Sequence, residues 1–333
     1  MSSNIKIAVD AMGGDNSPGK VIDGIIHHHK KNNDVFYKIF GDESEITKCL
    51  DKKIKKDNYK IINTLNKVSS EDSPLEAAKR GKDTSMWLAI ESVKNKDCDI
   101  VISAGNTGAL LVISKLNLKM IENIDKPALS ALWPNKKGMS VVLDLGANIE
   151  CSSKNLFDFS IMGASLYRSL YPNEAPNVAL LNIGSEELKG NETIKETYKL
   201  LNEKKSNDFV FSGYIEGNDL MNGHVNVIVS DGFTGNVALK TAEGTANFIT
   251  DELKKALSGS LIGKISSILN FYNLKKFKKR LDPRLYNGAI FIGLDSPVVK
   301  SHGGTDYIGF SNSLDVCCKI IKGNLIDKIK KNI

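Results

Sequence analysis

The sequence predicts an α/β protein in which a mostly parallel, twisted sheet carries helices on both faces, an α/β/α sandwich. Five β-branched apolar runs each lead into a loop of Gly, Asn, Asp or Thr, and a helical pattern follows. The runs cover residues 5–10, 98–104, 139–145, 177–183 and 225–230. Strands that alternate with helices are typical of βαβ units. Because no fixed-period repeat or linker divides the chain, we expect one domain over residues 1–333.

Helix signals occur where this fold needs them. Ser73 supplies an N-cap, Pro74 suits the first helical position, and a glutamate three residues after the serine completes a capping box. A helix should therefore open at residue 74. Further helical patterns cover 83–95 and begin at Thr107 and Asn236, each of the last two directly after a glycine-containing loop.

Residues 236–281 predict a helical hairpin that protrudes from the domain. Apolar residues at helical spacing describe one long helix, which Gly259 and Gly263 should break. A second pattern, over residues 265–272, describes the other arm.

The hairpin is also the basic part of the chain. Residues 254–284 hold nine Lys or Arg against one Asp, whereas the whole chain carries a formal charge of +6. Leu261 and Ile262 should be exposed at the tip, because a two-glycine turn has little room to bury them. Apolar residues among cations suit contact with anionic lipid, an acidic protein or a second copy, and a merely solvated basic face is the alternative.

Composition narrows the class of protein. No run approaches the roughly 18 consecutive apolar residues of a membrane span, and no secretory pattern precedes the first glycines, so we expect a cytoplasmic protein. The five cysteines have no C-x-x-C spacing, which argues against disulfides and against a metal site built on them. We expect no nucleic-acid partner.

The first loop superficially resembles a P-loop, because Gly14 to Lys20 spells G-x-x-x-x-G-K. A P-loop needs Ser or Thr after the lysine to hold Mg²⁺, and Val21 stands there instead. The G-x-G-x-x-G fingerprint of dinucleotide sites is absent from the chain as well. A nucleotide site is therefore not expected here.

Two interpretations of that loop remain open. In one, Gly13 and Gly14 only supply the backbone angles of a strand-to-helix turn. In the other, Asp10 and Asp15 belong to a site at the carboxyl end of the first strand, or orient neighbouring side chains there.

Two later loops, residues 103–109 and 230–240, place glycines beside Asn and Thr at a helix start. Free N–H groups and the helix dipole make such a turn a seat for an anion, with phosphate the natural guess. In the alternative interpretation Asn106 and Thr234 are helix caps. With the loop at 146–148, the candidate binding residues are Asn106, Thr107, Gly108, Asn148, Asp231, Gly232, Thr234 and Gly235. We expect all these loops to meet at one edge of the sheet.

Lys189 lies between Gly184 and Gly190, just past a buried strand end, where its ammonium could reach a phosphate. A solvated surface lysine is the alternative. His302 follows a strand-like run and could reach the same crevice, or could be structural. The consecutive histidines 27–29 point in different directions on a helix, so we expect no metal site there and a partly exposed helix end.

No Ser or Cys nucleophile motif is present, because G-x-S-x-G is missing and no cysteine occupies a glycine turn at a helix start. If the protein is an enzyme, a substrate should supply the nucleophile.

Taken together, the motifs resemble the bacterial phosphate acyltransferases of phospholipid synthesis, which move an acyl chain from acyl carrier protein to inorganic phosphate. The motifs are VDAMGGDNSP, ISAGNTGALL, DLGAN, LLNIGSEELKGN, VSDGFTGNVALKTAEG and NGAIFIGL followed by VVKSHGGTD, in the family's order from residue 9 to residue 306.

The resemblance implies that Lys189 and Asn236 are the catalytic residues, with Lys189 holding phosphate and Asn236 stabilising the thioester oxygen. Two positions depart from the family's pattern: Glu150 replaces a usual aspartate, and the segment after His302 is less rich in serine. The roles of these two residues therefore stay open.

The resemblance further implies that no cofactor or metal is needed. An enzyme whose apolar product must reach a membrane glycerol-3-phosphate acyltransferase gains from lying at the bilayer, so we expect peripheral contact of the hairpin with anionic membrane and a homodimer through its base. The alternatives are a short-chain phosphotransacylase that uses coenzyme A, a dehydrogenase of similar architecture, and a non-catalytic scaffold that binds membranes.

Overall fold

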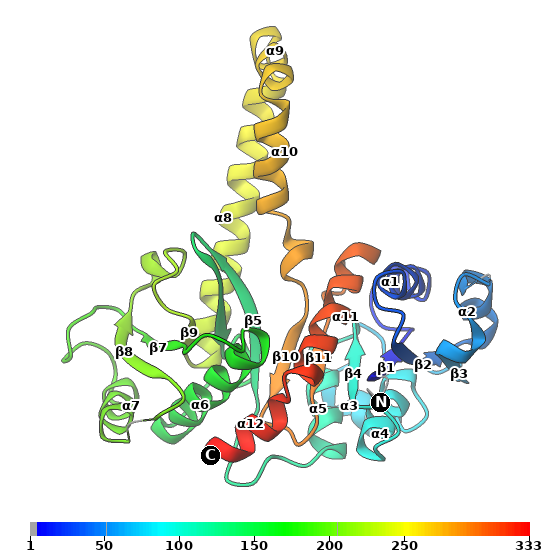
Figure 1. The fold of residues 1–333 in the computed structure, drawn as a ribbon, viewed down its shortest axis with the longest axis horizontal. Helices are drawn as coiled ribbons and strands as arrows, with labels where there is room; N and C mark the ends of the chain where they lie inside the picture. The colour runs from blue at the N-terminus through cyan, green and yellow to red at the C-terminus, as the bar shows by residue number, and fades with distance from the viewer. Residues whose placement is uncertain (1–4, 51, 205) are drawn as a thin grey trace.

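The computed structural model describes residues 5–50, 52–204 and 206–333, which build one sheet with helices on both faces and a long projecting hairpin (Figure 1). The strands are β1 (Ile5–Asp10), β2 (Val35–Gly41), β3 (Tyr59–Asn63), β4 (Ile100–Ser103), β5 (Ala128–Asn135), β6 (Gly138–Leu143), β7 (Asn177–Leu181), β8 (Val210–Ile215), β9 (Val227–Val229), β10 (Ala289–Ile292) and β11 (Val298–Lys300). The α-helices are α1 (Gly19–His29), α2 (Glu43–Leu50), α3 (Pro74–Arg80), α4 (Ser85–Lys94), α5 (Thr107–Asn117), α6 (Ser153–Leu170), α7 (Glu192–Glu203), α8 (Gly232–Ser258), α9 (Leu261–Leu269), α10 (Phe271–Arg280), α11 (Tyr307–Lys322) and α12 (Leu325–Asn332). The predicted α/β class is confirmed.

Each of the five predicted apolar runs contains a strand: β1, β4, β6, β7 and β9. The capping signal was also predicted correctly, because α3 begins at Pro74 and the Ser73 side chain accepts a hydrogen bond from the Glu76 N–H. No helix of the described residues is long and apolar enough to cross a membrane.

The sheet is mostly parallel, as predicted, but its central contacts are antiparallel. The sheet order is β3-β2-β1-β4-β11-β10-β5-β6-β9-β7-β8, and the contacts β11–β10, β10–β5 and β5–β6 are antiparallel. Three reversals leave β6, β9 and β7 running opposite to β1, β4 and β11. The five loops therefore do not all leave the same edge of the sheet.

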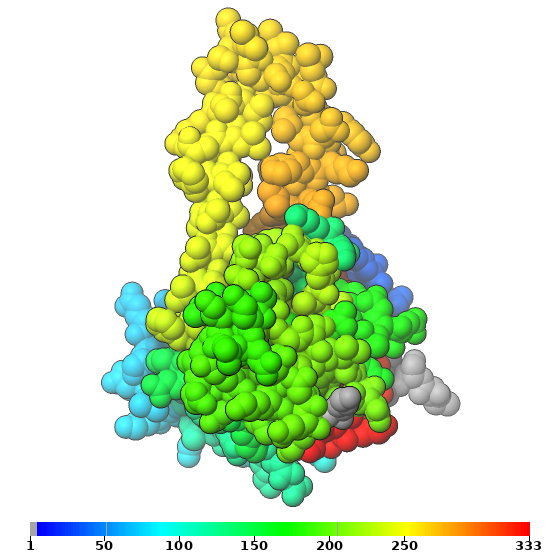
Figure 2. Space-filling view, turned by 90° about the vertical axis from the view of Figure 1, so that its left-hand side faces the viewer, coloured from blue at the N-terminus to red at the C-terminus, as the bar shows by residue number. Residues whose placement is uncertain are grey.

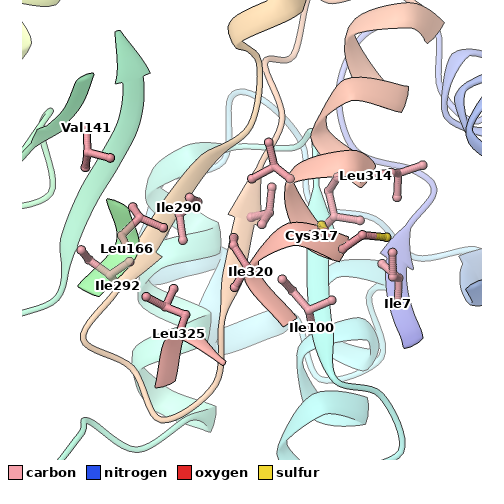
Figure 3. Packing of buried hydrophobic residues seen from close by; sticks show 14 of the residues in the cluster. Ile7, Ile100, Val141, Leu166, Ile290, Ile292, Leu314, Cys317, Ile320 and Leu325 are labelled. Atoms are coloured by element: carbon pink, nitrogen blue, oxygen red, sulfur yellow. The ribbon is translucent and has the colours of Figure 1, made fainter. Parts of the chain in front are cut away.

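Alternating side chains along each strand build the core on both faces of the sheet. On β4, Ile100 and Ile102 join the cluster under α1, α6 and α11, whereas Val101 joins the cluster under α4 and α5. Figure 3 shows side chains of β10 and α11, including Ile290 and Leu314, packed between the two halves of the sheet. One continuous core thus holds the two halves together.

The hairpin stands clear of the body of the protein (Figure 2). It consists of α8 as one arm, α9 at the tip and α10 as the other arm (Figure 1). As predicted, Leu261 and Ile262 are exposed there, by 78% and 81%.

Two details of the predicted hairpin are wrong. The helix α8 begins at Gly232, not at Asn236, because Asp231 caps it. Gly263 does not break a helix but lies in the first turn of α9, which Ser260 caps. A Cβ at Gly263 would lie 2.7 Å from the carbonyl oxygen of Ala256, so the glycine lets α9 fold closely onto α8.

Candidate active site

The predicted site residues form two groups, one at each edge of the sheet. We call the residues at the ends of β1, β4 and β11 the first cluster, and those at the ends of β6, β7 and β9 the second cluster. The first includes Asp10 and His302, and the second includes Lys189 and Asn236.

Asp10 holds the loops of the first cluster together. Its carboxylate is buried and accepts hydrogen bonds from the Ser85 and Ser103 hydroxyls, both at 2.6 Å, and from the Met12 N–H at 3.2 Å. Burial raises the pKa of Asp10, and these hydrogen bonds and Lys300 act against that rise. Of the interpretations left open, the structure supports the one in which Asp10 orients its neighbours.

The glycines after β1 are required by close packing. A Cβ at Gly13 would lie 2.6 Å from the backbone nitrogen of Gly105. Gly14 adopts a φ of +82°, which disfavours other residues. The loops after β1 and β4 therefore touch through backbone, with no room for side chains between them.

At the start of α5, Asn106 is a helix cap. Its side-chain oxygen accepts from the Ala109 N–H at 3.0 Å, and its amide donates to the Asp72 carbonyl at 2.9 Å. Thr107 is exposed, whereas Gly108 packs against Pro74. The capping interpretation therefore accounts for Asn106.

His302 is exposed beyond the end of β11. Its Nδ1 accepts from the Gly304 N–H at 3.1 Å, which places the imidazole proton on Nε2. Its pKa is lowered, chiefly by burial of part of the ring and next by the charge of Lys300. Near neutral pH His302 is thus an uncharged imidazole with an N–H donor at Nε2.

Sequence reasoning missed two lysines of the first cluster, Lys20 and Lys300. Both are buried, with 8% and 9% of their surface exposed. Lys300 ends β11, and Lys20 belongs to the loop sequence that was tested only as a P-loop.

In the second cluster, Asp144 organises the loop after β6. This buried carboxylate accepts from the backbone N–H groups of Leu129, Gly146, Ala147 and Asn148 and from the Asn148 amide, at 2.8–3.2 Å. The Asn148 amide also donates to the Pro127 carbonyl. Asn148 therefore has a structural role, and Asp144 is a positioning residue that sequence reasoning missed.

The start of α8 is seated on this loop. The Gly232 N–H donates to the Asn148 carbonyl at 2.8 Å, and Gly235 packs directly against the Asp144 carbonyl. Asp231 is the cap, because its carboxylate accepts from both the N–H and the hydroxyl of Thr234. The cap of α8 is thus Asp231, and the interpretation of Thr234 as the cap is wrong.

Asn236 is exposed on the first full turn of α8 and lies against Gly146. A Cβ at Gly146 would be 3.5 Å from the Asn236 side-chain carbon Cγ, and Gly146 has a φ of +127°. The loop that Asp144 fixes therefore determines where the Asn236 amide lies.

Lys189 is exposed in the loop between β7 and α7. Its backbone N–H donates to the Glu186 carbonyl, and the Asn182 amide donates to the Lys189 carbonyl. A Cβ at Gly184 would lie 3.0 Å from Lys189 Cγ, so this glycine leaves space for the lysine side chain.

An open pocket of about 480 Å³ lies where the second cluster's loops meet. It is lined by Ile149, Glu150, Cys151, Leu156, Asn191, Thr193, Ile194, Asp231, Phe233 and Thr234. Asn191 and Asp231 are the caps of α7 and α8, so the positive ends of two helix dipoles face the pocket. Glu150, whose role the sequence left open, is one of its lining residues.

One face of α8 connects the two clusters. Asn236, Lys240 and Glu243 share that face at helical spacing, and Glu243 lies about 10 Å along the axis from Asn236. The charges of Glu243 and Lys240 both act on the pKa of His302. The clusters are thus neighbours along one helix, although they belong to opposite edges of the sheet.

Other candidates have different roles. His28 is buried, where its Nδ1 contacts the Tyr37 hydroxyl at 2.6 Å and its Nε2 lies 3.3 Å from Asp315, so the expected partly exposed helix end is wrong for this histidine. Within the described part of the chain no group of three or more His, Cys, Asp or Glu could hold a metal ion.

The contact between Gly235 and Asp144 predicts a stability effect. Gly235→Ala should push α8 away from the loop and lower the free energy of unfolding by about 1–3 kcal/mol. Denaturant unfolding measures this change. Gly244→Ala is the matched control, because nothing lies within 4 Å of a Cβ there and alanine favours the helix. Equal stability of the two variants would contradict the packing role of Gly235.

Known proteins resemble the chain over nearly its whole length. The family model described as "Fatty acid synthesis protein" matches residues 5–328. A "Phosphate acyltransferase" of Pelagibacter ubique is 74% identical over 333 residues and covers 100% of both chains. One from Rhodospirillum rubrum is 44% identical, covering 100% of this chain and 95% of the relative. The solved EutD phosphotransacetylase from Staphylococcus aureus shares the fold, with a TM-score of 0.62 at 15% identity over 96% of this chain and 94% of that one.

Proposed function

The chain belongs to this fatty acid synthesis protein family, whose relatives above are phosphate acyltransferases, and we propose that it moves a long-chain acyl group from acyl carrier protein to inorganic phosphate. The observation that carries the proposal is the start of α8 in the second cluster, where Asn236 lies against the loop that Asp144 fixes. The helix caps Asn191 and Asp231 line the neighbouring pocket, whereas Lys189 and Asn236 are not among its lining residues. The N-termini of two helices suit a phosphate and a developing oxyanion.

The lining of the pocket supports an acyl donor. Ile149, Leu156, Ile194 and Phe233 give it apolar walls, and Phe233 is 64% exposed. Exposure of apolar side chains to water costs free energy. An acyl chain, or the pantetheine arm that carries it, can cover these side chains and remove that cost.

The reaction needs no nucleophile from the protein. A phosphate oxygen attacks the thioester carbonyl carbon, the C–S bond breaks, and the thiolate takes up a proton, leaving acyl phosphate and free thiol. Lys189 holds the phosphate by charge, and the Asn236 amide donates to the carbonyl oxygen as it becomes negative. Asp231, Gly232, Thr234 and Gly235 shape the start of α8, and Gly184 makes room for Lys189.

A comparison of acyl donors tests the proposed substrate. The protein should form acyl phosphate with long-chain acyl carrier protein and phosphate, and should turn over acetyl coenzyme A far more slowly. A preference for acetyl coenzyme A would instead favour a short-chain phosphotransacylase, and NAD-dependent turnover would favour a dehydrogenase.

The hairpin supports a dimer at the membrane. Its arms expose large apolar side chains, including Phe248, Ile249, Phe271 and Tyr272, each by 54% or more. Monomers rarely expose so much apolar surface. Figure 2 shows the two arms projecting side by side from the body, with a narrow opening between them below the tip. In this proposal the base of the hairpin forms a homodimer interface and the tip contacts anionic lipid.

Membrane contact would place the apolar product next to the enzyme that uses it, which we propose is a membrane glycerol-3-phosphate acyltransferase. Leu261 and Ile262 lie at the tip, and Lys264 follows them. Such an arrangement binds anionic bilayers by apolar burial and by charge.

Leu261→Glu/Ile262→Glu should abolish sedimentation with anionic liposomes, because it replaces the apolar tip with two negative charges. Val210→Glu is the control, since Val210 is a 58% exposed apolar residue of β8 in the body of the protein. If the double variant sediments like the parent, the tip is not the anchor; if the parent does not sediment either, the membrane proposal fails.

A further inference from the structure

Two buried ammonium groups share the first cluster. Lys300 ends β11 and Lys20 lies in the first turn of α1, and each is more than nine-tenths buried. Lysine is almost never buried to this extent unless its charge is paired. The cost of burying two like charges side by side calls for a compensating group.

The lysines have only backbone oxygens as close partners. Lys300 Nζ donates to the carbonyls of Ser301 and, at 3.4 Å, Ala104, whereas Lys20 Nζ donates to the Gly303 carbonyl. Within residues 5–50, 52–204 and 206–333 neither ammonium group forms an ion pair with a carboxylate. Carbonyl dipoles satisfy N–H groups but do not neutralise the charges.

The neighbouring acids act on the two lysines from a distance without pairing with them. The charge of Asp10 acts on Lys300, but both Asp10 oxygens already accept hydrogen bonds from serine hydroxyls. Asp15, whose charge acts on Lys20, is exposed to solvent. Neither ammonium group therefore has a carboxylate in direct contact.

The backbone of Gly14 packs closely against the ammonium group of Lys20. A Cβ at Gly14 would lie 2.9 Å from Lys20 Nζ and 2.9 Å from the Ala104 carbonyl oxygen, the same oxygen that Lys300 contacts. A side chain at Gly14 would therefore displace the lysine. His302, with its proton on Nε2, adds an uncharged donor nearby.

We infer that Lys20 and Lys300 form a second anion site, which binds a phosphate group. Two ammonium groups and an imidazole N–H match the several oxygens and the charge of phosphate better than they match a carboxylate. If the proposed function holds, that phosphate is either the free acceptor or the phosphodiester of the carrier's pantetheine arm. Both present the same oxyanion chemistry to the lysines.

The protonation of Lys300 gives the site a signature. Burial, and next the charge of Lys20, lowers the pKa of Lys300 to about 8, so above pH 8 the free protein holds this amine mostly uncharged. A bound anion favours the charged form of Lys300 and raises its pKa further, in the same direction as the charge of Asp10. Phosphate binding above pH 8 should therefore take up protons.

Calorimetric titration with inorganic phosphate, in buffers of different ionisation enthalpy, tests the site. Lys300→Met and Lys20→Met should each weaken phosphate binding at least tenfold, and Lys300→Met should abolish the proton uptake. Lys328→Met is the matched control, because burial also lowers the pKa of Lys328, whose Nζ donates to the Arg168 carbonyl in a distant part of the fold.

A second titration with carrier protein bearing the unloaded pantetheine arm identifies the source of the phosphate. If the lysine variants bind free phosphate more weakly, the site holds the acceptor phosphate. If they bind only the carrier protein more weakly, the site holds the phosphodiester of the pantetheine arm. Unchanged binding of both ligands in both variants would overturn the inference. If Lys300→Met does not fold, Lys20→Met and the proton uptake of the parent decide.

These titrations need no acyl donor, so they separate this inference from the proposed function. A protein that binds phosphate through Lys20 and Lys300 but transfers no acyl group would retain the site and lose the function. If the enzyme is active but the lysine variants bind phosphate and carrier as the parent does, the proposed function stands and the second anion site is wrong.

Discussion

Asn236→Ala should lower kcat about a hundredfold and leave binding of the thioester nearly unchanged. The amide acts on an oxygen that becomes negative only in the transition state, and removing one such donor typically costs about a hundred- to a thousandfold in rate. The fold should be unaffected, because Asn236 is exposed and contacts chiefly the backbone of Gly146. Steady-state kinetics with acyl carrier protein as donor measures the split between kcat and KM.

Asn247→Ala is the matched control, since Asn247 is an exposed asparagine further along the same helix. Its kinetics should equal those of the parent. If Asn236→Ala raises KM with kcat unchanged, Asn236 binds substrate or supports the helix and is not the oxyanion donor.

Lys189→Ala should remove most of the activity by weakening the hold on phosphate. A hydrogen bond between charged groups contributes about 1.5–3 kcal/mol, so kcat/KM for phosphate should fall by about ten- to a hundredfold. Thermal unfolding should be unchanged, because Lys189 lies exposed in a loop. Varying phosphate at saturating acyl donor measures the effect.

Lys199→Ala provides the control for charge alone, because Lys199 is an exposed lysine on the following helix, α7. Its phosphate dependence should match that of the parent. If the KM for phosphate is unaltered in Lys189→Ala, another residue holds the acceptor phosphate. Lys20 and Lys300 are then the first residues to examine.

Local signals in the sequence were sufficient for the helix starts that depend on neighbouring residues. The capping serine at 73 accepts from the backbone three residues later, and Asn106 does the same for α5. At the start of α8 the sequence interpretation considered only Thr234 as a cap, whereas Asp231 is the cap. The hydrogen bond from the Gly232 N–H to the Asn148 carbonyl accompanies this earlier start of the helix.

Strand direction depended in part on a contact that no local pattern records, because Ser130 of β5 pairs with Ile290 of β10. The other two antiparallel contacts, β5–β6 and β10–β11, join strands that follow each other in the sequence. Together the three contacts reverse the second half of the sheet. The prediction of a single edge for all loops failed for this reason.

The missed site residues have the same origin. Lys300 is buried because the loops after β1, β4 and β11 pack around it, and Asp144 accepts from Leu129 of β5 as well as from its own loop. Both residues stand in the motifs quoted above, DLGAN and VVKSHGGTD, but the sequence does not show that their side chains are buried. Lys189 and Asn236 were named in advance because the resemblance assigned roles to them.

In the proposed function phosphate itself attacks the thioester, and no acyl group passes through the protein. Thiol release from long-chain acyl carrier protein, followed in a single turnover with and without phosphate, tests this directly. We expect no thiol release without phosphate, and with phosphate one acyl phosphate for each thiol. A burst of thiol equal to the enzyme concentration in the absence of phosphate would reveal an acyl-enzyme and contradict it.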